Sequence, residues 1–116
     1  MGGLTTHVLD TSNGIPANDV CLKLYRLNGT VQELITEAIT NEDGRTDSPL
    51  LTSDDMKPGL YRIDFEIAAY FSKHSECSEN PFLDIIPIQF IVSDITRHFH
   101  VPLLVSPYGY STYRGS

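Results

Sequence analysis

The sequence is poor in cysteine and has no long apolar run. Its two cysteines, Cys21 and Cys77, are too few for the disulfide framework of a small secreted protein, and they lack CxxC or zinc-ribbon spacing. We therefore expect two reduced thiols in a cytoplasmic protein, with a single disulfide as the alternative. The N-terminal segment has neither a basic start nor an apolar centre, so no signal peptide is predicted. No stretch approaches the roughly 20 apolar residues that span a bilayer, so we expect no membrane partner.

Positive charge is also scarce. The sequence has eight Lys and Arg residues but 15 Asp and Glu residues. The resulting net charge of −7 would repel a phosphate backbone, which argues against a nucleic-acid partner. A small anionic ligand requires local convergence of the few cationic groups, among them His7, Arg45, His100 and Arg114. The 116 residues contain no repeat and no linker-like stretch, so we expect one domain over residues 1–116.

Short segments that alternate apolar and polar residues dominate the sequence, and they are typical of strands with one buried and one solvated face. The clearest runs from Leu60 to Ile67, where Tyr61, Ile63 and Phe65 share one face. Glycine turns at Asn13-Gly14 and Asp43-Gly44 separate neighbouring segments. Further strands are expected at 4–9, 20–25, 31–40, 82–92, 98–106 and 112–116.

Only one segment, 68–74, favours a helix, and a polar loop is expected to follow it over 75–81. Pro87 predicts an edge strand or a bulge, because proline cannot donate to a strand ladder. Seven or eight strands and one short helix indicate an all-β sandwich. Edge strands of such a sandwich can pair with another copy, so we expect an oligomer.

Four polar residues, three of them on these strands, are candidates for chemistry. His7 interrupts an apolar segment, where a histidine held only by its neighbours is the alternative to a functional one. His98 and His100 share one face because residues two apart on a strand point the same way. With His7 they could bind zinc, but no carboxylate or cysteine is near them in sequence and a solvated edge gives the same pattern, so we assign no metal. Arg45 follows the Asp-Gly turn, either as a solvated charge or as a cation that binds an oxyanion.

Two ends of the chain and one turn resemble a known family. The opening Leu4-Thr5-Thr6-His7-Val8-Leu9-Asp10, followed by Gly14-Ile15-Pro16-Ala17, and the turn Asn41-Glu42-Asp43-Gly44-Arg45 are similar to the transthyretin-related family. The closing run from His100-Val101-Pro102 to Tyr113-Arg114-Gly115-Ser116 resembles the signature of its enzymatic branch, which the hormone-carrying branch lacks. The segment 72–81 does not match the family.

The resemblance implies a transthyretin-like sandwich of two four-stranded sheets with one short helix. It further implies a homotetramer whose active sites lie where two dimers meet. The implied reaction is the hydrolysis of 5-hydroxyisourate to 2-oxo-4-hydroxy-4-carboxy-5-ureidoimidazoline in urate breakdown, with no cofactor. A transthyretin-like carrier of a small ligand, or an adaptor without catalysis, is the alternative.

The resemblance also implies the site residues. We expect His7 and His100 to orient and deprotonate water, while Arg45 keeps one imidazole neutral or binds the substrate carbonyls. His7 and Arg45 are thus expected in both catalysis and substrate binding. Tyr113, Arg114 and Ser116 are expected to bind substrate, although Arg114 and Ser116 could instead only support the C-terminal tail. His98 is left without a role.

Overall fold

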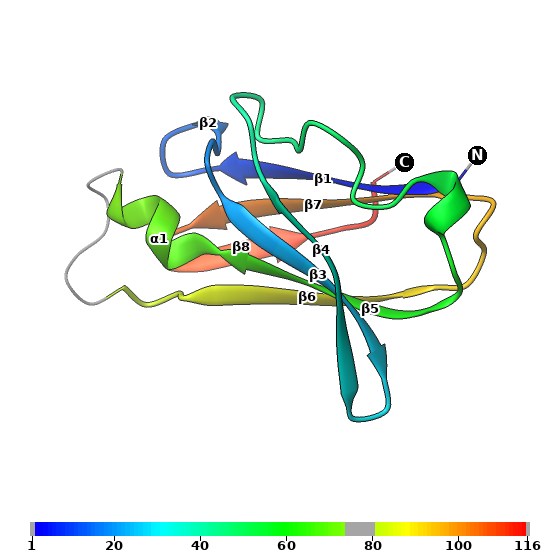
Figure 1. Cartoon of the computed structure of the whole chain (residues 1–116). Coiled ribbons are helices and arrows are strands. Elements are labelled where there is room, and N and C mark those ends of the chain that lie inside the picture. Colours follow the sequence, from blue (N-terminus) through cyan, green and yellow to red (C-terminus); the bar gives the residue numbers. More distant parts are fainter. Residues whose placement is uncertain (1, 74–80, 116) are drawn as a thin grey trace.

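The computed structural model describes residues 2–73 and 81–115 as eight strands, one α-helix and one 3-10 helix (Figure 1). The strands are β1 (Gly3–Asp10), β2 (Ile15–Pro16), β3 (Cys21–Asn28), β4 (Val31–Ile39), β5 (Gly59–Glu66), β6 (Ile85–Val92), β7 (His98–Ser106) and β8 (Gly109–Thr112). The α-helix, α1, covers Ile67–Ser72, and the 3-10 helix covers Ser53–Asp55. Within the described residues, no helix is long and apolar enough to cross a membrane.

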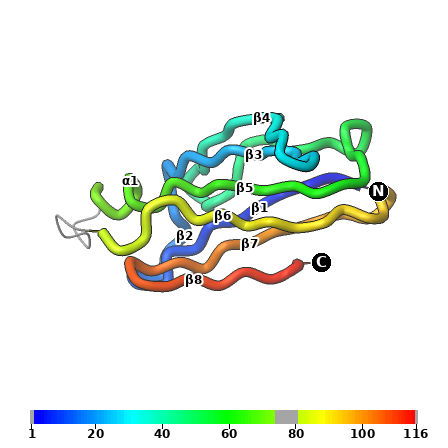
Figure 2. Tube along the Cα trace, turned by 90° about the horizontal axis from the view of Figure 1, so that it is seen from below, coloured from blue at the N-terminus to red at the C-terminus, as the bar shows by residue number. Residues whose placement is uncertain are grey.

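The strands form two four-stranded sheets, which confirms the predicted sandwich. The first sheet has the order β2-β1-β7-β8 and the second the order β4-β3-β5-β6. Figure 2 shows the two layers from below, with β6 and β8 at the near edges of their sheets. All pairings are antiparallel except that of β1 with β7, which is parallel. That parallel pair joins the two ends of the chain.

The core lies between the sheets and follows the predicted alternation. Tyr61, Ile63 and Phe65 of β5 are buried, whereas the residues between them are half-exposed. Burial of each such side chain stabilises the fold by about 1.5–3 kcal/mol. On β1, Leu4, Thr6 and Val8 are buried and face the core, which leaves Thr5 and His7 on the outer face of the first sheet.

Most predicted strands differ from the observed ones by a residue or more at their ends, and the two largest corrections concern the C-terminal half of the chain. The strand expected from Phe82 begins only at Ile85, because the Asp84 carbonyl accepts hydrogen bonds from the first backbone N–H groups of α1 instead of joining a ladder. The last strand was expected at 112–116, but β8 ends at Thr112. The predicted edge position of Pro87 is confirmed, since β6 is an edge strand.

The helix expected over 68–74 is confirmed as α1, which begins one residue earlier and ends at Ser72. Residues 74–80 lie outside the described residues, and so do Cys77 and most of the expected polar loop. Cys21 is a free, exposed thiol. Tyr70 of α1 reaches across to the first sheet, where its hydroxyl donates to Asp10 Oδ2 at 2.7 Å.

Asp10 is a buried carboxylate at the end of β1 that the sequence indicated only as the start of a turn. Burial by itself raises the pKa of Asp10, but hydrogen bonds from Asn13, Ser12 and Tyr70 outweigh it and lower the pKa below the ordinary value. The charged form therefore links the β1–β2 turn to α1.

Candidate active site

His7 and His100 lie on the same outer face of the first sheet. The parallel register places Thr5 beside His100 and His7 beside Pro102. Neighbours of opposite parity, such as Val8 and Val101, are buried in the core. The two histidines, far apart in sequence, therefore belong to one half-buried surface, together with His98.

The turn at 41–45 brings Arg45 to this surface by packing against β1. The Val8 N–H donates to the Gly44 carbonyl at 2.7 Å, and His7 forms an isolated antiparallel bridge with Arg45. Gly44 has a φ of 76°, and a Cβ at this position would overlap the Val8 carbonyl oxygen. The predicted turn is thus confirmed, and glycine is required there both by the left-handed φ and by the close approach to β1.

The same turn restrains His7. Its Nε2 donates a hydrogen bond to the Asp43 carbonyl oxygen at 2.8 Å. Because a backbone carbonyl only accepts, this contact keeps a proton on Nε2 and leaves Nδ1 as the lone-pair nitrogen of the neutral ring. His7 and Arg45 are therefore held by one docked turn.

The C-terminal tail covers His100. After β8 ends, Gly115 returns to the antiparallel register of the β7–β8 pair, and its N–H donates to the His100 carbonyl at 2.7 Å. A Cβ on Gly115 would lie 2.6 Å from Cδ2 of the His100 ring. The tail can approach this imidazole so closely because residue 115 is glycine. Ser116 lies outside the described residues.

Arg114 lies on the side of the tail that faces the other sheet. Its guanidinium is 4.2 Å from the centre of the Phe99 ring, and Nη2 donates to the His98 carbonyl at 3.4 Å. With Tyr113 it lines an apolar cleft of about 230 Å³ at the β6 and β8 edges. These contacts fit the alternative role of Arg114, support of the C-terminal tail, and no contact of its side chain with His7, Arg45 or His100 is seen among the described residues.

The electrostatics of the surface favour a neutral His100. Burial lowers the pKa of His100 below its ordinary value of about 6.5, and the positive charge of Arg45 lowers it further, followed by His7 and His98. Among residues 2–73 and 81–115, none hydrogen-bonds Nε2 of His100. This nitrogen can therefore act as a proton acceptor near neutral pH.

Sequence reasoning missed Thr5. Its hydroxyl lies 2.8 Å from Nδ1 of His100 and 3.0 Å from Nε2 of His98, and so connects the two imidazoles. The sequence indicated that Thr5 and His7 share one face of β1, because they are two residues apart. It did not indicate that β7, which carries His98 and His100, pairs with β1. In the described part of the chain, no three His, Cys, Asp or Glu residues are grouped as a metal site would require.

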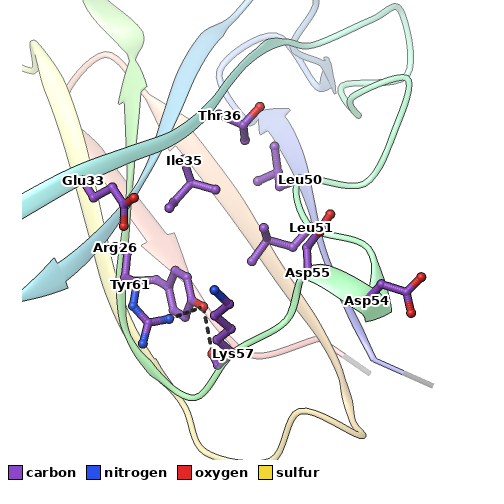
Figure 3. Close-up of a pocket in the computed structure, with 10 residues that line it drawn as sticks. All are labelled: Arg26, Glu33, Ile35, Thr36, Leu50, Leu51, Asp54, Asp55, Lys57 and Tyr61. Carbon is purple, nitrogen blue, oxygen red and sulfur yellow. Dashed lines mark hydrogen bonds between the residues drawn. The ribbon is translucent and has the colours of Figure 1, made fainter.

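A larger cleft, of about 460 Å³, lies elsewhere and contains none of the expected site residues. Figure 3 shows that it opens between the β3–β4 hairpin and the segment of residues 50–57. The Arg26 guanidinium in this cleft donates to the Tyr61 hydroxyl at 3.1 Å and to the Pro58 carbonyl at 2.9 Å. The guanidinium of Arg26 is thus bound by the protein itself. Lys57, Glu33 and Asp54 also line the cleft, but no histidine of the described residues does, so the imidazole bases lie elsewhere.

Comparisons with known proteins identify the family of the chain. A family model described as the HIUase/Transthyretin family matches residues 4–115. The 5-hydroxyisourate hydrolase of Deinococcus radiodurans is 48% identical over 114 residues, which cover 98% of this chain and 96% of that protein.

Two solved structures extend the comparison. The 5-hydroxyisourate hydrolase of Klebsiella pneumoniae superposes with a TM-score of 0.83 and 34% identity, over all of both chains. Sea bream transthyretin in complex with thyroxine superposes with a TM-score of 0.87 at 27% identity, over 97% of this chain and 94% of that one.

Proposed function

The chain belongs to the HIUase/Transthyretin family, and on that premise we propose that it hydrolyses 5-hydroxyisourate to 2-oxo-4-hydroxy-4-carboxy-5-ureidoimidazoline in urate breakdown. The observation that supports this most directly is the convergence of His7, Arg45 and His100 on one face. The reaction opens a six-membered ring at a cyclic amide. It requires an activated water and a positive charge near the carbonyl oxygen.

The two histidines and the arginine of the site argue against a ligand carrier, whereas the fold does not. The structure resembles sea bream transthyretin at least as closely as the Klebsiella hydrolase. Fold similarity therefore does not separate the two functions. The sequence does, because the relative with 48% identity is a hydrolase and because a carrier has no need for two histidines and an arginine on one surface.

We assign the activation of water to His100. Its depressed pKa keeps the ring neutral, and Nε2 is available to take a proton from water while the water oxygen attacks the carbonyl carbon. His7, whose Nε2–H is held by the Asp43 carbonyl, orients that water through Nδ1. The amide C–N bond then breaks with its electron pair on nitrogen, which receives the proton from the His100 imidazolium.

Arg45 stabilises the negative charge that develops on the carbonyl oxygen. Its guanidinium also disfavours the imidazolium form of His100, so one residue serves both roles expected from the sequence. Tyr113 and Ser116 are proposed to bind substrate, and Arg114 to hold the tail that carries them. These steps use only side chains and water.

We propose that the whole chain acts as one domain and that four copies form the active enzyme in the cytoplasm. The outer face with His7 and Arg45 is open in one chain, and apposition of a second copy would exclude water from it. The edge strands β6 and β8 leave Ile91 68% and Tyr110 46% exposed, which suits edge pairing between copies. Native mass spectrometry tests the assembly, and a monomer with full activity would contradict it.

The decisive experiment is a spectrophotometric assay with freshly prepared 5-hydroxyisourate, compared with its spontaneous decay. The wild-type chain should accelerate decay, and His7→Ala, Arg45→Ala and His100→Ala should each reduce the rate by at least about 100-fold with the assembly intact. Exposed Tyr108 lies outside the surface, so Tyr108→Phe is the control and should retain full activity. No acceleration by the wild-type chain would refute the proposed function.

A further inference from the structure

The Thr5 hydroxyl lies between the rings of His98 and His100, and neither Thr5 nor His98 has a role in the steps above. The distances of 3.0 Å to Nε2 of His98 and 2.8 Å to Nδ1 of His100 are both those of hydrogen bonds. The three side chains form a continuous chain of hydrogen bonds that ends at the proposed base. This chain connects the unexplained His98 to the reaction.

A hydroxyl has one proton, so the two bonds cannot be set independently. When both bonds form between neutral groups, Thr5 donates to one ring and accepts an N–H from the other. If Thr5 donates to His100, the proton of that ring must be on Nε2, and the proposed base is blocked. If Thr5 donates to His98, the proton of His100 is on Nδ1, and Nε2 is free.

We propose that Thr5 and His98 are positioning residues that hold His100 in the tautomer with its proton on Nδ1. The Thr5 hydroxyl donates a hydrogen bond to Nε2 of His98, and the Thr5 oxygen accepts one from Nδ1–H of His100. The proton from water then enters His100 at Nε2, and Nδ1–H keeps its bond to Thr5 throughout. This inference rests on the proposed function, because only water activation requires Nε2 to be free.

The charges around His100 explain why a chain of hydrogen bonds between neutral groups suits this site. Arg45, His7 and His98 are the charged or titratable groups that act on it. Within residues 2–73 and 81–115, no carboxylate forms an ion pair with either ring. A carboxylate partner would raise the pKa of His100, whereas a hydroxyl backed by a neutral imidazole orients the ring without stabilising its protonated form.

The fold makes room for this arrangement. Thr5 pairs with His100 in the parallel register, and Gly3 pairs with His98. A Cβ on Gly3 would lie 3.4 Å from Nδ1 of His98, so the imidazole rests against a position without a side chain. The His98 ring can therefore lean along β1 toward Thr5. The Arg114 contact with the His98 carbonyl holds the backbone on its other side.

The first test replaces the hydroxyl and keeps the shape. Thr5→Val should lower kcat about tenfold with little change in KM, because the tautomers of His100 are then no longer biased. Thr5→Ser keeps the hydroxyl and should stay within about twofold of the wild type. Thr6→Val is the matched control, since Thr6 faces the core from the same strand and its hydroxyl donates to the Val101 carbonyl. It should leave kcat unchanged even if it lowers the melting temperature.

The second test distinguishes control of the His100 tautomer through the hydrogen-bond chain from a merely structural role of Thr5 and His98. In His98→Phe the Thr5 hydroxyl has lost its acceptor and turns to donate to His100 Nδ1, so kcat should fall further than in Thr5→Val. Removing that hydroxyl as well should then restore activity to the level of Thr5→Val. If the Thr5→Val/His98→Phe double variant is slower than His98→Phe, the proposed control of the His100 tautomer by Thr5 and His98 is wrong.

Nitrogen NMR of the imidazoles reads the tautomer without any turnover. The wild type should show His100 protonated at Nδ1, and His98→Phe should move the proton toward Nε2. An unchanged tautomer in both Thr5→Val and His98→Phe, or a wild type protonated at Nε2, would overturn the inference. If the NMR result is as expected but the wild type does not accelerate the decay of 5-hydroxyisourate, the proposed function fails while the hydrogen-bond chain stands.

Discussion

Gly115 offers a sharp test of how closely the tail must pack on the site. A Cβ added there would lie 2.6 Å from Cδ2 of His100, and the two atoms must separate by about 0.8 Å to reach ordinary contact at 3.4 Å. Either the tail moves or the imidazole tilts. A displacement of about 1 Å at a catalytic group can cost about 100-fold in rate.

We therefore expect Gly115→Ala to lower kcat/KM for 5-hydroxyisourate by about 100-fold, which corresponds to about 2.7 kcal/mol of transition-state stabilisation. Stability should change much less. The variant puts at risk one backbone hydrogen bond, from the Gly115 N–H to the His100 carbonyl, worth about 1 kcal/mol. The melting temperature should fall by only about 3–5 °C.

Gly109→Ala is the matched control for this experiment. Gly109 lies in β8, close to the same edge, but a Cβ there has only the Ser106 hydroxyl near it, at 4.0 Å. This variant should retain the rate and stability of the wild type. Full activity of Gly115→Ala, or an equal loss in both variants, would show that close packing of the tail on His100 does not matter for catalysis.

Three other predictions concern charge, the core and metal. Arg45→Gln removes a positive charge that disfavours the imidazolium form of His100, so the pKa of His100 should rise and the acidic limb of the kcat/KM profile should move to higher pH. Arg45→Lys keeps the charge and should leave this limb in place. A limb that moves to lower pH in Arg45→Gln contradicts the assignment. Tyr70→Phe removes a hydrogen-bond donor from the buried carboxylate of Asp10, so it should lower the free energy of unfolding, measured by urea denaturation, by about 1.5–3 kcal/mol. Tyr108→Phe is the control and should have little effect. Equal losses in the two variants would contradict the role of the Tyr70–Asp10 hydrogen bond. EDTA should leave the rate unchanged, and a clear loss of activity would support a metal at the histidines instead.

The alternation of apolar residues was enough to predict most strands and the two-sheet sandwich. A residue's side of its own strand depends only on local parity, so the burial of Tyr61, Ile63 and Phe65 followed from the sequence. Local parity failed at the strand ends. Phe82 and Leu83 are apolar and were expected in the strand, but the carbonyl of Asp84 after them accepts hydrogen bonds from the first turn of α1, which is a tertiary interaction.

The candidate site could be predicted only in part. The resemblance at the chain ends and at the turn 41–45 indicated His7, Arg45 and His100, together with Tyr113 to Ser116. Arg114 was expected among the substrate-binding residues, and its contacts with Phe99 and the His98 carbonyl became known only from the structure. Thr5 drew no attention, because a threonine on a strand is ordinary until its neighbours are known.

The sequence by itself determined which side chains face outward from each strand and where the glycine turns occur, because both depend on local backbone geometry. Only the tertiary structure decided that β1 pairs in parallel with β7, which brings Thr5 to His100 across a separation of 95 positions. It also decided that the turn at 41–45 docks on β1 and places Arg45 beside His7. Alternation with a period of two specifies which face of a strand a side chain occupies but not which strand pairs with it, and the candidate site depends on that pairing.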